Sequence, residues 1–218
     1  MAAAAPTLEI EADLHRQGAR FVIGCDEVGR GAIAGPVGVG MAVVSEIMPP
    51  IPERLRDSKL LSEKRRDELE PLTRDWALFS AVGLATADEV DRLGISACLG
   101  LAGKRALMSL HEAGVAIHDS VILLDGHFDW LSPALVNPLR VQTRTKADRD
   151  CASVSAASIV AKVHRDRIMI AEDTRIPGYG WSGNKGYGSA AHYEAIDRLG
   201  PSELHRHTWL KTQLEIAL

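Results

Sequence analysis

The chain has 218 residues, of which 46% are hydrophobic, and a formal net charge of −4. It lacks the run of about 20 apolar residues that crosses a bilayer, and its alanine-rich start lacks the basic flank of a signal peptide. Three cysteines without a CxxC pair favour neither a disulfide framework nor a cysteine zinc site. We therefore expect a cytoplasmic protein without membrane contact, in which residues 1–18 fray and residues 19–218 form a single domain.

The first predicted elements after this tail are strands. Apolar runs predict strands over Arg20 to Cys25 and Pro36 to Ser45, with a glycine-rich turn between them, and a third strand over Trp76 to Thr86. A charged helix precedes the third strand, and Ser62 has the side chain of a good helix N-cap.

The second half of the sequence alternates between predicted helices and strands. Strands are predicted over Ser120 to Leu124 and Leu139 to Thr143, and a glycine-rich loop over Gly178 to Gly188. This order predicts the α/β class, a mixed sheet flanked by helices with a helical C-terminal part. The predicted helices are Ile95 to Ala113, Cys151 to Glu172, Ala190 to Leu199 and Thr208 to Ile216.

Acidic side chains follow two predicted strands directly. Asp26 and Glu27 end the first strand, and Asp125 ends the strand that begins at Ser120. If these strands are parallel neighbours, the acids converge at one edge of the sheet, where a hard cation such as Mg²⁺ or Mn²⁺ would offset their mutual repulsion. Asp148 or Asp150, before the long helix, could complete the cluster. Taken singly, each acid is equally well explained as a turn cap.

Basic residues gather in two segments although the chain is acidic overall. Arg54 to Arg66 and Arg140 to Arg167 each carry an excess of four positive charges. Such segments are typical of surfaces that bind phosphates, and equally of solvated helix faces. The negative net charge alone argues weakly against binding to nucleic acid.

Two other classes of protein, a dinucleotide-binding enzyme and a non-catalytic nucleic-acid-binding module, account for only part of these patterns. Gly29 to Gly35 reads GxGxxxG, as in a dinucleotide-binding turn, but such a turn opens a helix, whereas Pro36 leads into a β-rich run. A non-catalytic nucleic-acid-binding module would account for the basic segments and leave Asp26, Glu27 and Asp125 without a purpose.

Several separate motifs resemble those of the type 2 ribonuclease H family, which includes bacterial ribonuclease HII. They occur in order from about residue 20 to about residue 208. The matching segments are Asp26-Glu27-Val28-Gly29-Arg30-Gly31, Asp57-Ser58-Lys59 with Leu61-Ser62, Asp125-Gly126, Lys146-Ala147-Asp148, Ala156 to Val163 with Arg165-Asp166-Arg167, Lys185-Gly186-Tyr187 and His205 to Thr208.

The resemblance implies a ribonuclease H-like fold and an endonuclease that cuts the RNA strand of RNA/DNA hybrids. It also implies nicking on the 5′ side of ribonucleotides embedded in DNA, leaving 3′-OH and 5′-phosphate ends, with a role in ribonucleotide and primer removal during DNA repair and replication. Asp26, Glu27, Asp125 and Asp148 would hold two Mn²⁺ or Mg²⁺ ions. Asp150 and Asp166 stay open as alternatives for the fourth acid. We expect a monomer.

The resemblance further implies how the duplex is held. The Gly29-Arg30-Gly31 turn would follow the backbone at the ribose 2′-OH, and the Tyr187 ring would stack on the next sugar. The resemblance also implies that Ser158 contacts the nucleic acid. Phosphate contacts are implied for Lys59, Lys146, Lys162 and Lys185, with solvated surface lysine as the alternative for each. His192, His205 and His207 are expected in surface or packing roles rather than as metal ligands.

Overall fold

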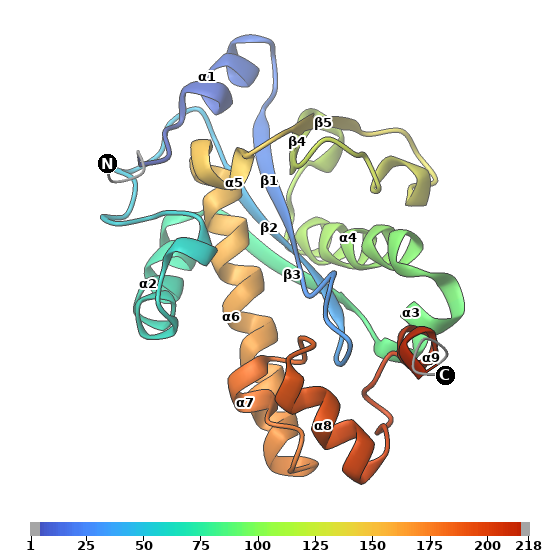
Figure 1. Cartoon of the computed structure of the whole chain (residues 1–218). Coiled ribbons are helices and arrows are strands. Elements are labelled where there is room, and N and C mark those ends of the chain that lie inside the picture. The colour runs from blue at the N-terminus through green and yellow to red at the C-terminus, as the bar shows by residue number, and fades with distance from the viewer. Residues whose placement is uncertain (1–4, 215–218) are drawn as a thin grey trace.

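The computed structural model describes residues 5–214 and contains a five-stranded sheet of order β3-β2-β1-β4-β5 (Figure 1). β2 is antiparallel to β1 and β3, whereas β4 is parallel to β1 and β5. This arrangement confirms the predicted mixed sheet. The strands are β1 Phe21–Val28, β2 Val37–Val44, β3 Phe79–Ala85, β4 Ser120–Asp125 and β5 Arg140–Arg144.

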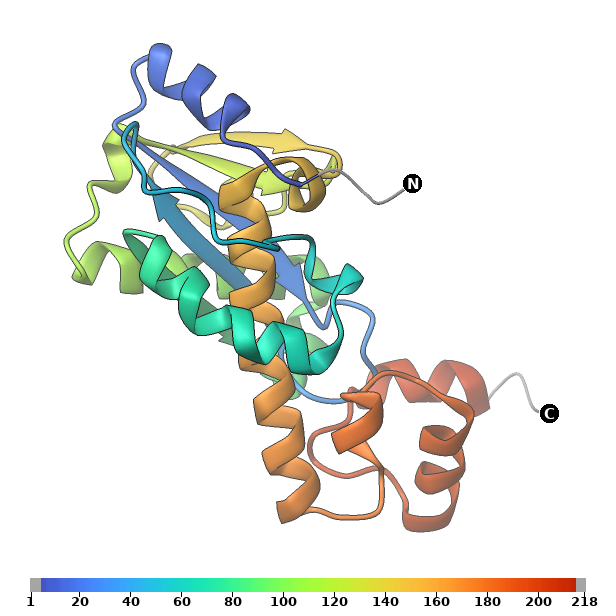
Figure 2. The same cartoon turned by 90° about the vertical axis from the view of Figure 1, so that its left-hand side faces the viewer.

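Helices cover both faces of the sheet. α4 (Ile95–Glu112) lies on one face, and α6 (Ala152–Arg175) crosses the other with α2 (Glu63–Trp76) packed outside it (Figure 2). A Cβ added at Gly24 would lie 2.2 Å from the Ser153 carbonyl carbon. Only glycine lets α6 approach β1 this closely, and α6 thereby brings its own polar side chains to the end of β1 that carries the acids.

The structure also shows a helix that the patterns missed. Ser62 caps α2 as predicted, since its side chain accepts a hydrogen bond from the Arg65 N–H. The missed helix, α3 (Ala87–Leu93), begins at a capping box formed by Thr86 and Glu89. The predicted third strand extended over Thr86 and so hid this helix start.

The N-terminal segment differs from the expected frayed tail. Residues Glu9–Arg16 form α1, and Glu11 on this helix is only 1% exposed. Its carboxylate accepts hydrogen bonds from the backbone N–H and the hydroxyl of Ser153, at 2.9 and 2.7 Å. A carboxylate at the N-terminal turn of a helix is favoured by the helix dipole, so α1 docks on the start of α6.

The C-terminal part packs against the far end of α6 (Figure 1). An apolar cluster that includes Met169, Tyr179 and Trp181 joins the two. The predicted glycine-rich loop contains the short α7, and the predicted last helix is described to Leu214, its remainder lying outside the described residues. The remaining helices are α5 Ala147–Asp150, α7 Trp181–Asn184, α8 Ala190–Leu199, α9 His207–Leu214 and the short 3₁₀ turns Ser58–Leu60, Ile117–Asp119 and Ser132–Ala134. Within residues 5–214, no helix has the length and apolar character needed to cross a membrane.

Candidate active site

The acids at the strand ends come together as the sequence predicted. Cys25 of β1 is paired with Leu124 of β4 in parallel register, so Asp26 and Asp125 follow at neighbouring positions. The backbone N–H of Asp148 donates to Asp125 Oδ1 at 3.2 Å, which fixes α5 beside the same sheet edge. The structure therefore places one acid from each of three elements at one point.

A cleft of about 210 Å³ opens at this point. Asp148, Lys146 and Lys185 are not among its lining residues, although Asp148 contacts two residues that are, Asp125 and Lys59. The cleft is bounded by the ends of β1 and β4, the turn after β1, the 3₁₀ turn at Ser58, α6 and the loop before α8. Its lining residues are Asp26, Glu27, Val28, Gly29, Arg30, Gly31, Ser58, Lys59, Asp125, Ser158, Lys162 and Tyr187.

The carboxylates in the cleft are costly to ionise. Burial raises the pKa of Asp26 well above its usual range, against the opposing effect of Lys59, and the charges of Glu27 and Asp125 raise it further. Burial likewise raises the pKa of Glu27 and of Asp125, the latter also because Asp148 lies close. A site that keeps several such acids together favours a cation that neutralises them.

Lys59 supplies part of this neutralisation. Its ammonium donates to Asp148 Oδ2 at 3.0 Å. The pKa of Lys59 is raised because the field of Asp26 and the bond to Asp148 outweigh burial. The side chain is largely exposed, and its ammonium is nevertheless paired with an acid of the cluster.

The donor chemistry of the cleft fits a hard divalent ion. Carboxylate oxygens are the ligands that Mg²⁺ and Mn²⁺ prefer, and Asp26 is buried, with Lys59 as the basic side chain that most lowers its pKa. In the part of the chain that the structure describes, no three Asp, Glu, His or Cys side chains are gathered closely enough to hold an ion as they stand. Asp26, Glu27 and Asp125 line one cleft, and Asp148 adjoins it through Asp125 and Lys59.

The surroundings of the alternative acids favour Asp148 as the fourth member. Asp150 forms an ion pair with Arg149 at 2.7 Å, and its pKa is lowered by that bond. Asp166 accepts from Lys162 Nζ at 2.6 Å on α6. Asp148 has a basic partner too, but that partner is Lys59, which lines the acidic cleft, and the Asp148 backbone N–H donates to Asp125. Asp148 is thus the candidate that is joined to the other acids.

The predicted phosphate contacts divide into two groups. Lys59 and Lys162 line the cleft, and Lys146 is exposed beside α5. Lys185 is only 6% exposed, and its ammonium is held by Glu63 Oε2 at 3.1 Å and by the Ser182 carbonyl. The structure therefore does not bring Lys185 to the cleft.

Ser158 lies at the floor of the cleft. It is 2% exposed, and its hydroxyl is 2.8 Å from that of Ser58. A hydrogen bond from Ser158 also lowers the pKa of Asp26, against the larger effect of burial. Ser158 therefore supports Asp26 and joins α6 to the turn that carries Lys59.

Two buried arginines hold the glycine-rich turn, and the sequence patterns did not single them out for this role. Arg165 donates to the carbonyls of Pro36, Lys185 and Ala34 at 2.8 to 3.0 Å. Arg206 donates to the carbonyls of Gly29, Arg30 and Gly35 at 2.7 to 3.2 Å. Burial, with Arg165 nearby, lowers the pKa of Arg206 to about 10.

These contacts leave the N–H side of the turn free. The carbonyls of Gly29 and Arg30 are taken by Arg206. Among residues 5–214, the N–H groups of Arg30 and Gly31 donate to no protein acceptor, and both residues line the cleft. A free pair of backbone donors beside two buried guanidinium groups can bind an oxygen of a polar or anionic ligand.

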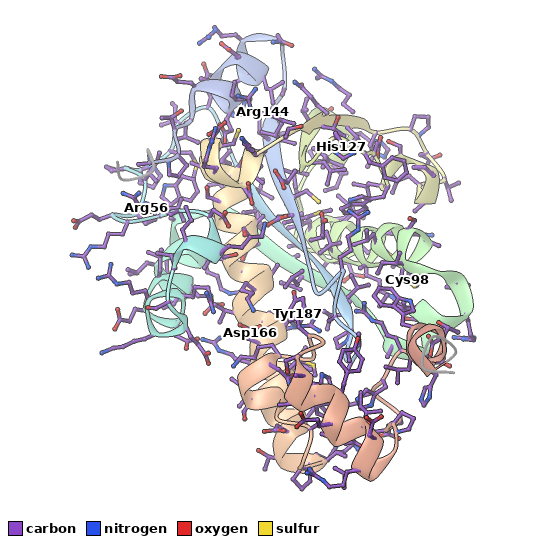
Figure 3. The ribbon with its side chains drawn as sticks, viewed as in Figure 1. Arg56, Cys98, His127, Arg144, Asp166 and Tyr187 are labelled. Atoms are coloured by element: carbon purple, nitrogen blue, oxygen red, sulfur yellow. The ribbon has the colours of Figure 1, made fainter. Side chains whose placement is uncertain are left out.

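Tyr187 closes the cleft opposite the acids. Figure 3 shows it beside α6, near the end of β1. The ring is 38% exposed and lies 5.5 Å from the Arg165 guanidinium carbon. The turn and Tyr187 are joined, since the N–H groups of Ile33 and Ala34 donate to the Gly186 carbonyl.

The three C-terminal histidines lie outside the acidic cleft, in the packing and surface positions expected for them. His192 and His205 are fully buried and hydrogen-bonded to each other, and His207 is exposed at the start of α9. None of the three lines the acidic cleft.

Fold and cleft together define a nuclease of the ribonuclease H type, and solved structures similar in fold agree. Ribonuclease H2 from Pyrococcus horikoshii OT3 superposes with a TM-score of 0.67 at 27% identity, over 87% of this chain and 93% of that one. The ribonuclease HII in the PCNA:RNase HII complex from Archaeoglobus fulgidus shares the fold at a TM-score of 0.64 and 24% identity, over 87% and 95% of the two chains.

Sequence comparison narrows this class to one family. The ribonuclease HII family model matches residues 23–212. A ribonuclease HII of Thermus thermophilus is 46% identical over 90% of this chain and 89% of its own, and that of Streptomyces griseus is 43% identical over 94% and 84%. The chain belongs to the ribonuclease HII family, and it is a ribonuclease H, a phosphodiester hydrolase.

Proposed function

We propose that this ribonuclease H cuts the RNA strand of RNA/DNA hybrids and nicks DNA on the 5′ side of an embedded ribonucleotide, leaving 3′-OH and 5′-phosphate ends. The observation that carries the proposal is the shared cleft. Asp26 and Asp125 line a cleft of about 210 Å³. The same cleft is lined by Arg30 and Gly31 of the glycine-rich turn and by Tyr187. A phosphodiester held at the acids would place its neighbouring sugars against that turn and ring.

Each side of the cleft has a distinct task in this proposal. The N–H groups of Arg30 and Gly31 receive the 2′-OH, the group that separates RNA from DNA. Tyr187 stacks on the following sugar. Lys59, Lys146 and Lys162 contact phosphates, and Ser158 holds Asp26 in place.

Asp26, Glu27, Asp125 and Asp148 would hold Mn²⁺ or Mg²⁺, as expected from the sequence. Two bound ions supply an activated water and stabilise the leaving 3′ oxygen. A solved relative of the same fold, Bst-RNase HIII, has been crystallised with Mn²⁺. The function proposed here is removal of ribonucleotides and RNA primers in DNA repair and replication, by a cytoplasmic monomer.

The glycine-rich turn gives a prediction that separates folding from recognition. Gly29 has φ +74, and a Cβ there would lie 2.1 Å from Arg165 Nε. Because Arg165 is held by three carbonyls, Gly29→Ala should cost roughly 2 to 4 kcal/mol of stability. Gly31 is outside the positive-φ set, and a Cβ there meets nothing within 4 Å.

We therefore expect Gly31→Ala to keep the wild-type melting temperature and to lose about ten- to hundredfold in kcat/KM, because its methyl group displaces the approaching sugar. Thermal unfolding and cleavage assays on both variants check this. Full activity of Gly31→Ala would show that the sugar does not approach the turn.

The test of the proposal is cleavage of three labelled duplexes of one sequence: all DNA, DNA with one ribonucleotide, and a continuous RNA/DNA hybrid. We expect cutting of the last two only, with the single-ribonucleotide product carrying a 3′-OH on the deoxynucleotide before the ribose. Efficient cutting of the all-DNA duplex, or product ends with 3′-phosphate, would refute the proposal.

A further inference from the structure

A hydrogen-bond network of buried aromatic side chains lies behind Tyr187. His192 of α8 and His205 of the following segment are both 0% exposed, and they pack against Tyr179 and Trp181, whose rings stack at 4.9 Å. Two fully buried imidazoles outside the acidic cleft need partners for every nitrogen. The network supplies these partners and ends on the backbone of Tyr187.

The partners fix the direction of each hydrogen bond. The Ser202 N–H donates to His205 Nδ1 at 2.9 Å, so a neutral His205 carries its proton on Nε2. The Trp181 indole N–H donates to His192 Nε2 at 3.0 Å, so a neutral His192 carries its proton on Nδ1. The two Nε2 atoms are 3.2 Å apart, and His205 is therefore the donor between them.

The remaining proton of the network points at Tyr187. His192 Nδ1 is 2.9 Å from the Tyr187 carbonyl and donates to it. Tyr187 lies between Gly186 and Gly188, and its N–H donates to the Asn184 carbonyl. The Gly186 side is held further by the N–H groups of Ile33 and Ala34, which donate to the Gly186 carbonyl. The hydrogen bond from His192 therefore fixes the peptide plane on the Gly188 side, where glycine gives the backbone its freedom.

We propose that His192 is a positioning residue for Tyr187, and that the substrate selectivity of the cleft depends on His192 and His205 both being neutral. The inference rests on the proposed function, because it concerns the ring assigned to the sugar after the ribonucleotide. A proton added to His192 Nε2 would point at two other donors, the indole N–H of Trp181 and the Nε2–H of His205, and would be repelled by them. The imidazole of His192 would then move, and its hydrogen bond to the Tyr187 carbonyl would change.

The environment of the pair favours the neutral forms. Burial lowers the pKa of His192, and burial together with His192 lowers the pKa of His205 to about 4. Asp173 of α6 is not free to pair with either imidazole, since it accepts from the backbone N–H of Trp181 and the Ser182 hydroxyl. The other titratable or charged groups near the network from the packed elements are Tyr179, Arg165, Lys185, Tyr193, Glu194, Arg206 and His207.

The sign of the pH effect follows from these shifts. A histidine whose pKa is lowered on folding contributes its full stabilisation above the ordinary value of 6.5, and loses it as the pH falls below that value. Selectivity is a property of the folded enzyme and follows the folded-state pKa values, so it should be constant around pH 6.5 and decline only as the pH approaches about 4, the pKa of His205.

Two substitutions separate the contacts of His192. His192→Asn places an amide N–H where Nδ1 stood and keeps a donor for the Tyr187 carbonyl. His192→Gln places an acceptor where Nε2 stood, toward Trp181 and His205, and loses that donor. Neither side chain titrates.

The experiment measures kcat/KM for the single-ribonucleotide duplex and for the continuous hybrid between pH 5.5 and 8, with melting temperatures alongside. Protonation of the acids in the cleft lowers kcat/KM for both duplexes, so the ratio of the two kcat/KM values removes this common effect. We expect the Gln variant to lower the ratio about tenfold and the Asn variant to restore most of it. The wild-type ratio and the Asn ratio should both stay flat over this range, because the folded histidines have lowered pKa values and stay neutral.

A double variant tests whether the effect passes through the ring. In a Tyr187→Ala background, His192→Gln should leave the ratio unchanged. A wild-type ratio in the Gln variant, equal losses in Gln and Asn, or a wild-type ratio that changes with pH between 5.5 and 8 would overturn the inference. If the wild type cuts neither substrate, the proposed function itself fails, which is a different result.

Discussion

Replacing either central acid, as Asp26→Asn or Asp125→Asn, should reduce cleavage about a thousandfold or more while duplex binding is retained. Each change removes one charge from a cleft that needs a cation, and the several kcal/mol that bound ions contribute to the transition state correspond to this loss. The phosphate contacts proposed for Lys59 and Lys162 do not involve the substituted carboxylates. Rates at saturating Mn²⁺ and Mg²⁺, together with duplex affinity in a binding assay, measure both parts of the expectation.

Stability gives a second measurement that does not depend on activity. Asp26 Oδ1 accepts from the Glu27 N–H at 2.8 Å, and Asp125 Oδ1 accepts from the Asp148 N–H, bonds that an asparagine oxygen can keep. Because ionised Asp26 is costly to bury, the metal-free Asn variants should melt no lower than the wild type. Added Mn²⁺ should raise the wild-type melting temperature more than theirs, since ions bind the folded wild type better.

Asp150→Asn is the matched control, because Asp150 lies two residues from Asp148 and pairs with Arg149. It should leave cleavage and the Mn²⁺ effect unchanged, whereas Asp148→Asn should reduce both. Near-wild-type rates in either Asp26→Asn or Asp125→Asn would remove these acids from the chemistry. A large loss in Asp150→Asn would reassign the fourth acid.

The position of each acid at the end of a strand could be predicted from local order, and the convergence of the acids followed on the condition that the two strands are parallel neighbours. Asp26 and Asp125 each follow a buried strand, and neighbouring parallel strands bring such residues to one edge of a sheet. The Ser62 cap and the long helix α6 were predictable for the same reason, since caps and apolar periodicity are local signals. The family motifs then indicated which of the many carboxylates to combine.

What the sequence did not show depends on contacts between distant segments. Lys185 reads as a free cation in a glycine-rich loop, but Glu63, 122 positions away, pairs with its ammonium. Likewise α1 is ordered because Glu11 meets Ser153. Arg165 and Arg206 occur in the family motifs without an assigned role, and only the folded turn supplies the carbonyls that allow their burial.

The histidine network belongs to the same class. The direction of its hydrogen bonds follows from two donors, the Trp181 indole N–H to His192 and the Ser202 N–H to His205. Trp181 and Ser202 lie 11 and 10 positions from His192 in the sequence. A pattern can indicate that these histidines pack, as predicted, and cannot indicate which nitrogen carries the proton. That assignment requires the geometry of both neighbours.

Tyr187→Ala should lower cleavage at a single embedded ribonucleotide roughly tenfold to a hundredfold, because stacking on an aromatic ring contributes about 1 to 3 kcal/mol. The ring faces the cleft, and Arg165 beneath it keeps its three carbonyl bonds when the ring is removed. The loop should therefore remain folded. Tyr187→Phe should be milder, since it keeps the ring.

The opposing explanation is that Tyr187 only packs the glycine-rich loop. Tyr193→Ala is the control for it, because the Tyr193 ring lies against Gly188 in the same loop and does not line the cleft. A ring on the sugar that follows the ribonucleotide fits deoxyribose closely and is crowded by a 2′-OH. Loss at Tyr187 should therefore be larger on the single-ribonucleotide duplex than on the continuous hybrid, whereas Tyr193→Ala should affect both substrates equally. If Tyr187→Ala leaves the ratio of the two rates unchanged and lowers the melting temperature as Tyr193→Ala does, the ring has a packing role alone.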